Sequence, residues 1–305
     1  MILGEPRWID VTVPAGQLRA LVWGDCDNPD APLALCQHGF PDTAYGWRKL
    51  APLLIDAGYR VVAPFLRGYV PSSLPSDGSY HVGALMDDLL RVREAAGPTD
   101  RDVLIGHDWG AMAAAGVAAM PDNPFRRTVI MSVPLSAAFR IGSERARLFA
   151  ELPAQLARSW YILFFQLPWL PEQSASRIVG FLWRRWSPGY AAGEDLRHVD
   201  AAIGAPQRWQ AALGCYRALV RSPKPPPRYA QLHRRWTSAA RPAGPVLYLH
   251  GADDGCFAAE FTQWVAKVLP EGSDTAVVPG AGHFLQLEQP QRVGDCIVEF
   301  IGRAG

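Results

Sequence analysis

The sequence predicts an α/β protein with a mostly parallel, eight-stranded sheet that is flanked by helices and carries a helical insertion. Short apolar runs alternate with helical patterns over residues 1–136 and again over residues 242–305. Such alternation builds a parallel sheet with helices on both faces. Residues 137–241 are instead rich in Trp, Arg and Pro and lack strand-like runs, so we expect a separate helical unit there.

The eight predicted strands are of two kinds. Residues 7–13 and 17–23 alternate apolar and polar side chains, which is typical of half-buried antiparallel strands. The other six are short runs that we assign to the parallel part of the sheet: 32–37, 59–63, 102–105, 127–132, 245–249 and 274–278.

Helical patterns fill the connections between these strands. Residues 81–96 place Leu85, Leu89 and Val92 on one face and end at Gly97-Pro98, as a helix should. The remaining predicted helices of the sheet-bearing part are 44–57 (ended by Gly58), 109–120, 259–268 and 289–301.

Composition limits the classes of function. The 305 residues are 49% hydrophobic and 19% charged, enough for one large core plus an insertion. The formal net charge of +1 predicts no nucleic-acid or anionic-surface partner. No apolar run approaches the roughly 20 residues of a membrane span, and the first residues lack a signal-peptide pattern. We therefore expect a cytoplasmic monomer or homodimer.

The five cysteines favour the same location. Cys26, Cys36, Cys215, Cys256 and Cys296 are odd in number, scattered, and contain no C-x-x-C pair. They are typical of reduced thiols rather than of a disulfide framework or a zinc site.

Asp108 is the most informative residue of the chain. It stands at the centre of Gly106-His-Asp-Trp-Gly110, where a predicted strand turns sharply into a helix. The G-x-S-x-G elbow of serine hydrolases has this layout, with glycines that allow the strained turn. A carboxylate is ionised at neutral pH, with a reference pKa of about 3.9, and can attack a saturated carbon to form an ester.

Hydrolysis of that ester needs a base that titrates near neutral pH, which suggests a histidine. His283 follows the last predicted strand in a Gly-rich loop. An acid that orients it should follow the preceding strand, where Asp254 is our first choice and Asp253 the alternative. The chain order of nucleophile, acid and histidine is that of α/β-hydrolases.

Ester hydrolysis also builds negative charge on the carbonyl oxygen of Asp108, so N–H donors should point there. The backbone N–H of Trp109, the residue after the nucleophile, is one candidate. The loop 37–42 after the third strand supplies the other, and Phe40 is well placed between Gly39 and Pro41.

These residues together resemble the α/β-hydrolase-fold epoxide hydrolases over nearly the whole chain. The H-G-x-P motif of that family reads His38-Gly-Phe-Pro41, and its nucleophile motif reads Gly106-His-Asp-Trp-Gly110. The resemblance implies that two tyrosines of the insertion, or cap, donate protons to the epoxide oxygen. Tyr161 precedes Phe-Gln-x-Pro as in the family, and Tyr216 precedes Arg217.

Gly214 and Cys215 stand where the family has Asn and Trp. The resemblance further implies that a small apolar epoxide and water give a vicinal diol, without a metal or organic cofactor. We expect four further side chains to contact the substrate: His38, Pro41, Trp160 and Phe164.

Two other functions compete with this interpretation. A haloalkane dehalogenase shares the aspartate nucleophile, but that family usually has Asn where this chain has Phe40, and it does not need the tyrosine pair. A non-catalytic ligand-binding homologue would have no need of a base. A serine esterase is disfavoured because Asp108 replaces the serine.

Overall fold

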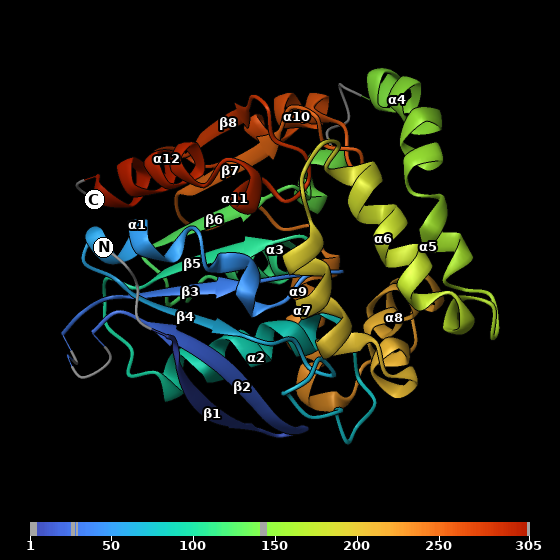
Figure 1. Ribbon diagram of the computed structural model, residues 1–305. Helices are drawn as coiled ribbons and strands as arrows, with labels where there is room; N and C mark the ends of the chain where they lie inside the picture. The colour runs from blue at the N-terminus through green and yellow to red at the C-terminus, as the bar shows by residue number, and fades with distance from the viewer. Residues whose placement is uncertain (1–4, 26–27, 29, 141–144, 304–305) are drawn as a thin grey trace.

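A computed structural model describes residues 5–25, 28, 30–140 and 145–303 of the chain (Figure 1). It confirms the predicted α/β architecture, with one eight-stranded sheet in the order β1-β2-β4-β3-β5-β6-β7-β8. Only the pairs β1–β2 and β2–β4 are antiparallel, so β2 alone runs opposite to the other seven strands. The strands are β1 Arg7–Val13, β2 Gly16–Trp23, β3 Leu33–Gln37, β4 Arg60–Pro64, β5 Val103–His107, β6 Arg127–Met131, β7 Val246–Gly251 and β8 Asp274–Val278.

The register of the parallel strands brings the catalytic candidates to one edge of the sheet. Gln37 at the end of β3 pairs with Gly106 of β5, and His107 pairs with Met131 at the end of β6. Because parallel strands end on the same side, the loops that follow them lie next to one another. All residues of β3, β5 and β6 are buried, which fixes this edge rigidly in the core.

Helices cover both faces of the sheet. On one side α2 (Val82–Ala95) packs against α3 (Trp109–Ala118), while on the other α1 (Ala51–Asp56) packs against α12 (Pro290–Gly302) (Figure 1). The helix predicted over 44–57 is two pieces, the 3₁₀ turn η1 (Ala44–Trp47) and α1. Pro52 explains the break, since proline has no N–H and is tolerated only in the first turn of a helix.

The helix predicted over 259–268 is also divided, into η5 (Ala259–Phe261) and α10 (Thr262–Ala266). Two short elements were not predicted, η2 (Ser136–Arg140) after β6 and α11 (Leu285–Glu288) after the His283 loop. Both contain few residues, and so they offer little periodicity to a sequence pattern.

The segment between β6 and β7 contains only helices in its described residues, and we call the part from α4 to α9 the cap. Its longer members are α4 (Arg145–Arg158), α6 (Ala175–Trp186), α7 (Gly193–Ile203), α8 (Pro206–Arg221) and α9 (Pro227–Thr237); shorter ones are α5 (Trp160–Phe164) and η4 (Pro171–Gln173). The domain boundaries predicted at 136/137 and 241/242 stay a prediction.

Specific hydrogen bonds hold the cap to the sheet-bearing part. The indole N–H of Trp183 donates to the Pro41 carbonyl at 2.9 Å, and the His283 N–H donates to the Trp186 carbonyl at 2.9 Å. Among the described helices, none combines the length and apolar composition needed to cross a bilayer. Cys36, Cys215, Cys256 and Cys296 are free thiols, and Cys26 lies outside the described residues.

Candidate active site

Asp108 lies in a strained turn between β5 and α3. Its φ of 53° and ψ of −116° are unusual for a residue with a side chain, and such strain costs on the order of 1–3 kcal/mol. A Cβ at Gly106 would lie 2.7 Å from the carbonyl carbon of Gly110, and one at Gly110 would clash with the Gln37 backbone. Both glycines of the motif are therefore needed to seat the turn against β3.

The carboxylate of Asp108 faces the loop after β3. Its Oδ1 accepts a hydrogen bond from the Phe40 N–H at 2.7 Å, and the residue is only 5% exposed. Gly39 makes room for this approach, because a Cβ there would clash with Asp108 Oδ1 and lie 2.5 Å from the Trp109 nitrogen. Of the two expected N–H donors, that of Phe40 bonds this oxygen, and the backbone nitrogen of Trp109 lies beside the same close approach of Gly39.

His283 and Asp254 form a buried pair beside this carboxylate. The Nδ1 atom of His283 lies 3.0 Å from Asp254 Oδ2, and both side chains are fully buried. Asp254 Oδ1 accepts two backbone N–H groups, from Cys256 at 2.6 Å and Phe257 at 3.2 Å. Asp253 is exposed, so the geometry selects Asp254, the first choice from the sequence, as the partner of His283.

The backbone of His283 is held by two further side chains. Its carbonyl accepts from Ser132 Oγ at 2.7 Å and lies 2.9 Å from Nε2 of His107. Burial lowers the pKa of His107 to about 3, so its ring is neutral and Nε2 can donate. These bonds tie the His283 loop to the ends of β5 and β6.

The free ring nitrogen of His283 faces Asp108. Nε2 lies 3.7 Å from Asp108 Oδ2, slightly beyond hydrogen-bonding distance, and has no hydrogen-bond partner among the described residues. Burial alone would lower the pKa of His283, but the carboxylates of Asp254 and Asp108 outweigh it and raise the pKa to about 10. At neutral pH the resting site therefore contains an imidazolium between two carboxylates.

This ion pairing predicts a pH-dependent stability. Between the unperturbed pKa of 6.5 and the folded value of about 10, the folded protein holds a proton that the unfolded chain has released. The contribution of His283 to the free energy of unfolding is complete below pH 6.5 and is lost as the pH rises through 10. Urea titrations from pH 6 to pH 10 should show wild type losing more stability than His283→Gln; parallel curves would contradict this charge state.

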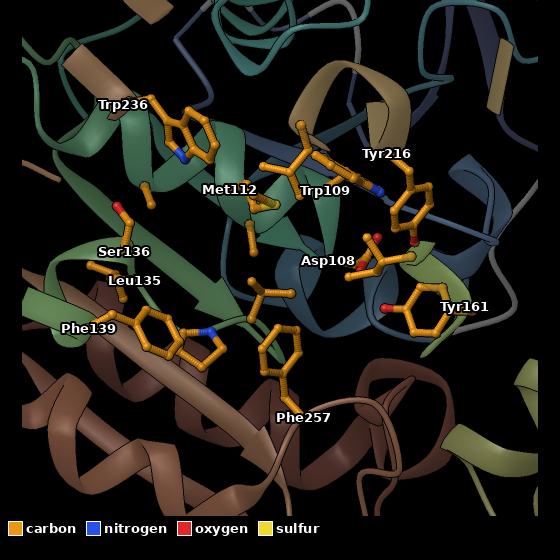
Figure 2. A pocket seen from close by; sticks show the side chains of 16 residues that line it. Asp108, Trp109, Met112, Leu135, Ser136, Phe139, Tyr161, Tyr216, Trp236 and Phe257 are labelled. Carbon is orange, nitrogen blue, oxygen red and sulfur yellow. The ribbon is translucent and has the colours of Figure 1, made fainter. Parts of the chain in front are cut away.

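Two buried tyrosines of the cap face the same carboxylate. Tyr161 of α5 and Tyr216 of α8 are each 2% exposed, and their hydroxyl groups point toward Asp108 (Figure 2). The two rings contact each other edge to face at 5.6 Å. Burial and the nearby charge of Asp108 raise both pKa values well above 10, so both hydroxyls remain protonated and can donate.

The partners of the two hydroxyls differ. The Tyr161 hydroxyl lies 3.5 Å from the Sγ of Cys256, within hydrogen-bonding distance for sulfur. The Tyr216 hydroxyl is buried without a hydrogen-bond partner in the described structure. An unpartnered buried hydroxyl is costly, and this one lies in the lining of the cavity, where it is available to a polar atom that enters.

An apolar cavity of about 170 Å³ extends from Asp108 and the tyrosines toward Trp236 (Figure 2). Among the side chains that the structure describes, Asp108 is the one charged group in its lining. Its walls come from α3, the segment after β6, the cap and the loop after Asp254. The lining includes Met112, Ala115, Val133, Leu135, Phe139, Ile162, Leu219, Trp236 and Phe257.

The four residues expected to contact the substrate lie outside this lining: His38, Pro41, Trp160 and Phe164. His38 holds the loop instead, since its Nε2 accepts from the Leu66 N–H at 3.0 Å and its Nδ1 lies 2.9 Å from the Gly39 carbonyl. Pro41 anchors Trp183 through its carbonyl, as described above. Trp160 is 39% exposed and sits on the outside of α5.

Most wall residues were missed because they are distant in sequence from any motif. For two of these wall residues the sequence does contain a pattern that indicates their position. Met112 and Ala115 follow Asp108 by four and seven residues, a spacing that places them on the same helical face as the nucleophile.

One group of described residues has the composition of a metal site. Ligand atoms of Asp254, Cys256 and His283 lie within 4.8 Å of one another. The hydrogen bond between Asp254 and His283 already uses two of these atoms, so the arrangement is better suited to orienting an imidazole than to holding an ion.

The topology of the sheet and the position of the elbow define a class of protein. The family model described as alpha/beta hydrolase fold matches residues 32–290, and the chain belongs to this family.

Relatives with related names span nearly the full chain. Epoxide hydrolase A of Mycobacterium tuberculosis is 29% identical, covering 98% of both chains. The AB hydrolase superfamily protein YfhM of Bacillus subtilis is 28% identical over 89% of this chain and 91% of its own. The crystal structure of Epoxide Hydrolase A from Mycobacterium thermoresistibile superposes with a TM-score of 0.71 at 25% identity, covering 97% and 98% of the two chains.

Proposed function

We propose that this protein is an epoxide hydrolase that forms a covalent ester on Asp108. The observation that carries the proposal is the convergence of two protonated, buried tyrosines on a carboxylate at the tip of a nucleophile elbow (Figure 2). The names of the relatives support the same activity. An epoxide needs this combination, because ring opening creates an alkoxide that must receive a proton.

In the first step Asp108 Oδ2 attacks one ring carbon, and the C–O bond of the epoxide breaks. The bond electrons go to the ring oxygen, which takes a proton from the Tyr161 or Tyr216 hydroxyl. Asp108 Oδ1 stays bonded to the Phe40 N–H and becomes the ester carbonyl oxygen. The imidazolium of His283 can then return a proton to the tyrosinate, which leaves the imidazole neutral.

Esterification changes the proton affinity of His283. The charge of Asp108 is one of the contributions that raise its pKa, and the ester removes that charge. The neutral imidazole can then take a proton from a water molecule, which attacks the ester carbonyl carbon while Asp254 stabilises the imidazolium that forms. The N–H groups of Phe40 and Trp109 stabilise the negative oxygen. As this intermediate collapses, the bond between the Asp108 carboxyl carbon and the substrate oxygen breaks, and that oxygen takes the remaining proton of the added hydroxyl. Release of the diol leaves the Asp108 carboxylate beside the imidazolium, as in the resting site.

The cavity sets the size of the substrate. An apolar cavity of roughly 150 Å³ takes up a benzene molecule, so about 170 Å³ accommodates a group with one six-membered ring or a comparable chain. The described lining is almost wholly apolar, with Asp108 as its one charged member, and this favours neutral, apolar epoxides such as a styrene oxide.

Isotope labelling tests the covalent step. In heavy-oxygen water, a single turnover with enzyme in excess should place the label in the Asp108 carboxylate and leave the first diol unlabelled. Mass spectrometry of the peptide containing Asp108 checks this result. Label in the first diol would mean direct attack by water and would overturn the mechanism. Assays of diol and halide release from epoxides and haloalkanes separate the proposal from a dehalogenase and from a binding protein.

The tyrosines should act on ring opening only. Tyr161→Phe and Tyr216→Phe are each expected to slow ester formation by about 10²-fold, a typical contribution of a general acid. The rate of ester hydrolysis, measured after rapid mixing, should stay close to wild type. For Tyr216→Phe the free energy of unfolding should not fall, because the lost hydroxyl has no partner in the described structure. Equal slowing of both steps would argue against the assignment.

A further inference from the structure

The near-zero net charge of the chain conceals two oppositely charged parts. Residues 137–241 contain 16 Arg and Lys against 6 Asp and Glu, a formal charge of +10. The rest of the chain contains 14 against 23, a formal charge of −9. The two charges nearly cancel, so the net charge of the whole chain gave no sign of an anionic partner. Residues 137–241 taken alone are strongly basic.

The helix that carries Tyr161 is apolar on all sides. Tyr161 is buried and faces the catalytic cavity, whereas Trp160 and Leu163 of the same helix are 39% and 67% exposed. A helix that is hydrophobic all round is normally covered on every side. In Figure 1, α5 and the chain that follows it lie at the outer edge of the cap, away from the sheet.

Exposed apolar side chains continue beyond α5 onto its neighbours. We call this surface the outer cap face; its apolar members are Leu156, Trp160, Leu163, Leu167, Trp169, Leu170 and Phe181. The rings of Trp160 and Phe181 lie 6.0 Å apart, which joins α5 to α6. Trp169 is 62% exposed, an unusual position for so large an apolar side chain.

Arginines are interleaved with these side chains on α6. Arg177, Arg184 and Arg185 lie four, three and four residues from Phe181, which places them on the same exposed face. Within the described residues none of the three forms an ion pair. Glu172 is the one acidic residue between residues 153 and 185, and it is already bonded to Arg217 at 2.6 Å.

We infer that the outer cap face is a docking surface for an anionic lipid bilayer. Interleaved tryptophan, leucine and arginine side chains match the boundary between lipid headgroups and acyl chains, where apolar groups insert and cations meet phosphates. A second copy of the chain is a weaker fit. The acidic part of one copy would have to contact the basic cap of the next, which uses two different surfaces. Contacts of this kind tend to extend into open filaments rather than form a closed dimer.

Docking would place the cavity near a source of substrate. This inference stands independently of the proposed reaction, since it rests on the surface alone. Apolar epoxides of the size that fits the cavity dissolve in bilayers. Trp160 on the docking face and Tyr161 in the cavity are adjacent residues of one helix, so the bilayer would lie next to the helix that carries one proton donor.

Vesicle flotation tests the inference with the full chain. Wild type should bind phosphatidylcholine vesicles that contain one-third phosphatidylglycerol and should not bind pure phosphatidylcholine. Since each arginine near an anionic surface contributes about five-fold, the triple variant Arg177→Gln, Arg184→Gln, Arg185→Gln should bind about 100-fold more weakly. The double variant Leu163→Ser, Trp169→Asn should also lose binding, by removing the two most exposed apolar members.

The matched control changes three exposed arginines of the acidic part, Arg91→Gln, Arg101→Gln and Arg292→Gln, and should bind like wild type. Unchanged thermal unfolding of all variants shows that folding is retained. Failure of wild type to bind anionic vesicles would overturn the inference, as would an equal loss in the control. Self-association that the cap variants abolish, without vesicle binding by wild type, would assign the face to a second copy instead.

Discussion

Replacement of His283 with glutamine is expected to leave an enzyme that opens one epoxide per active site and then stops. Asp108 would still be aligned by the Phe40 N–H and would still attack, so the ester would form. The glutamine cannot take a proton from water, and removal of a general base typically slows a step by about 10²–10⁴-fold. Intact-protein mass spectrometry should therefore show the alkylated enzyme accumulating to one equivalent, while steady-state diol production falls by that factor.

His198→Gln is the matched control, because His198 stacks on Tyr45 at 4.1 Å and does not line the cavity. It should turn over at the wild-type rate. Normal multiple turnover by His283→Gln, without a trapped ester, would remove His283 from the role of base.

Replacement of Asp108 with alanine should have the largest effect, since it removes the atom proposed to bond to the substrate. Turnover should fall by about 10⁴-fold or more, and no ester should form. Binding of an apolar ligand in the cavity should persist, because the wall is built from other side chains. Diol formation and ligand-induced thermal stabilisation, measured on the same preparation, separate the two effects.

Asp253→Ala is the companion control, since it removes an exposed carboxylate from the loop that holds Asp254. It should retain wild-type activity. Substantial diol formation by Asp108→Ala, with retained folding, would mean that water attacks the epoxide directly and that the carboxylate is not the nucleophile.

The sheet and its reactive loops could be predicted because they depend on local patterns. Buried parallel strands are short apolar runs, and the elbow needs glycines on both sides of Asp108. The choice of Asp254 over Asp253 could only be ranked from the sequence, because it depends on which carboxylate the turn buries beside His283. The cavity wall was largely unpredictable, since Trp236 and Phe257 reach it through tertiary packing of distant segments.

The substrate-contact assignments show the same limit. Trp160 and Phe164 lie close to Tyr161 in sequence, but a helix turns successive side chains in different directions. Of the residues of α5, Tyr161 and Ile162 line the cavity, while the side chain of Trp160 is exposed on the surface. Sequence proximity to a reactive residue is thus a poor guide to contact with its substrate.

The insertion of the cap between β6 and β7 separates, along the chain, the groups proposed for the two half-reactions. The groups proposed to split the ester all follow strands of the sheet, whereas both groups proposed to protonate the leaving oxygen come from inserted helices. In the proposed mechanism, ester cleavage thus depends on the sheet-bearing part alone, and the inserted helices decide which electrophile reacts with Asp108. Exchange of this one segment between homologues should therefore change the type of bond that is opened while the hydrolytic machinery stays the same.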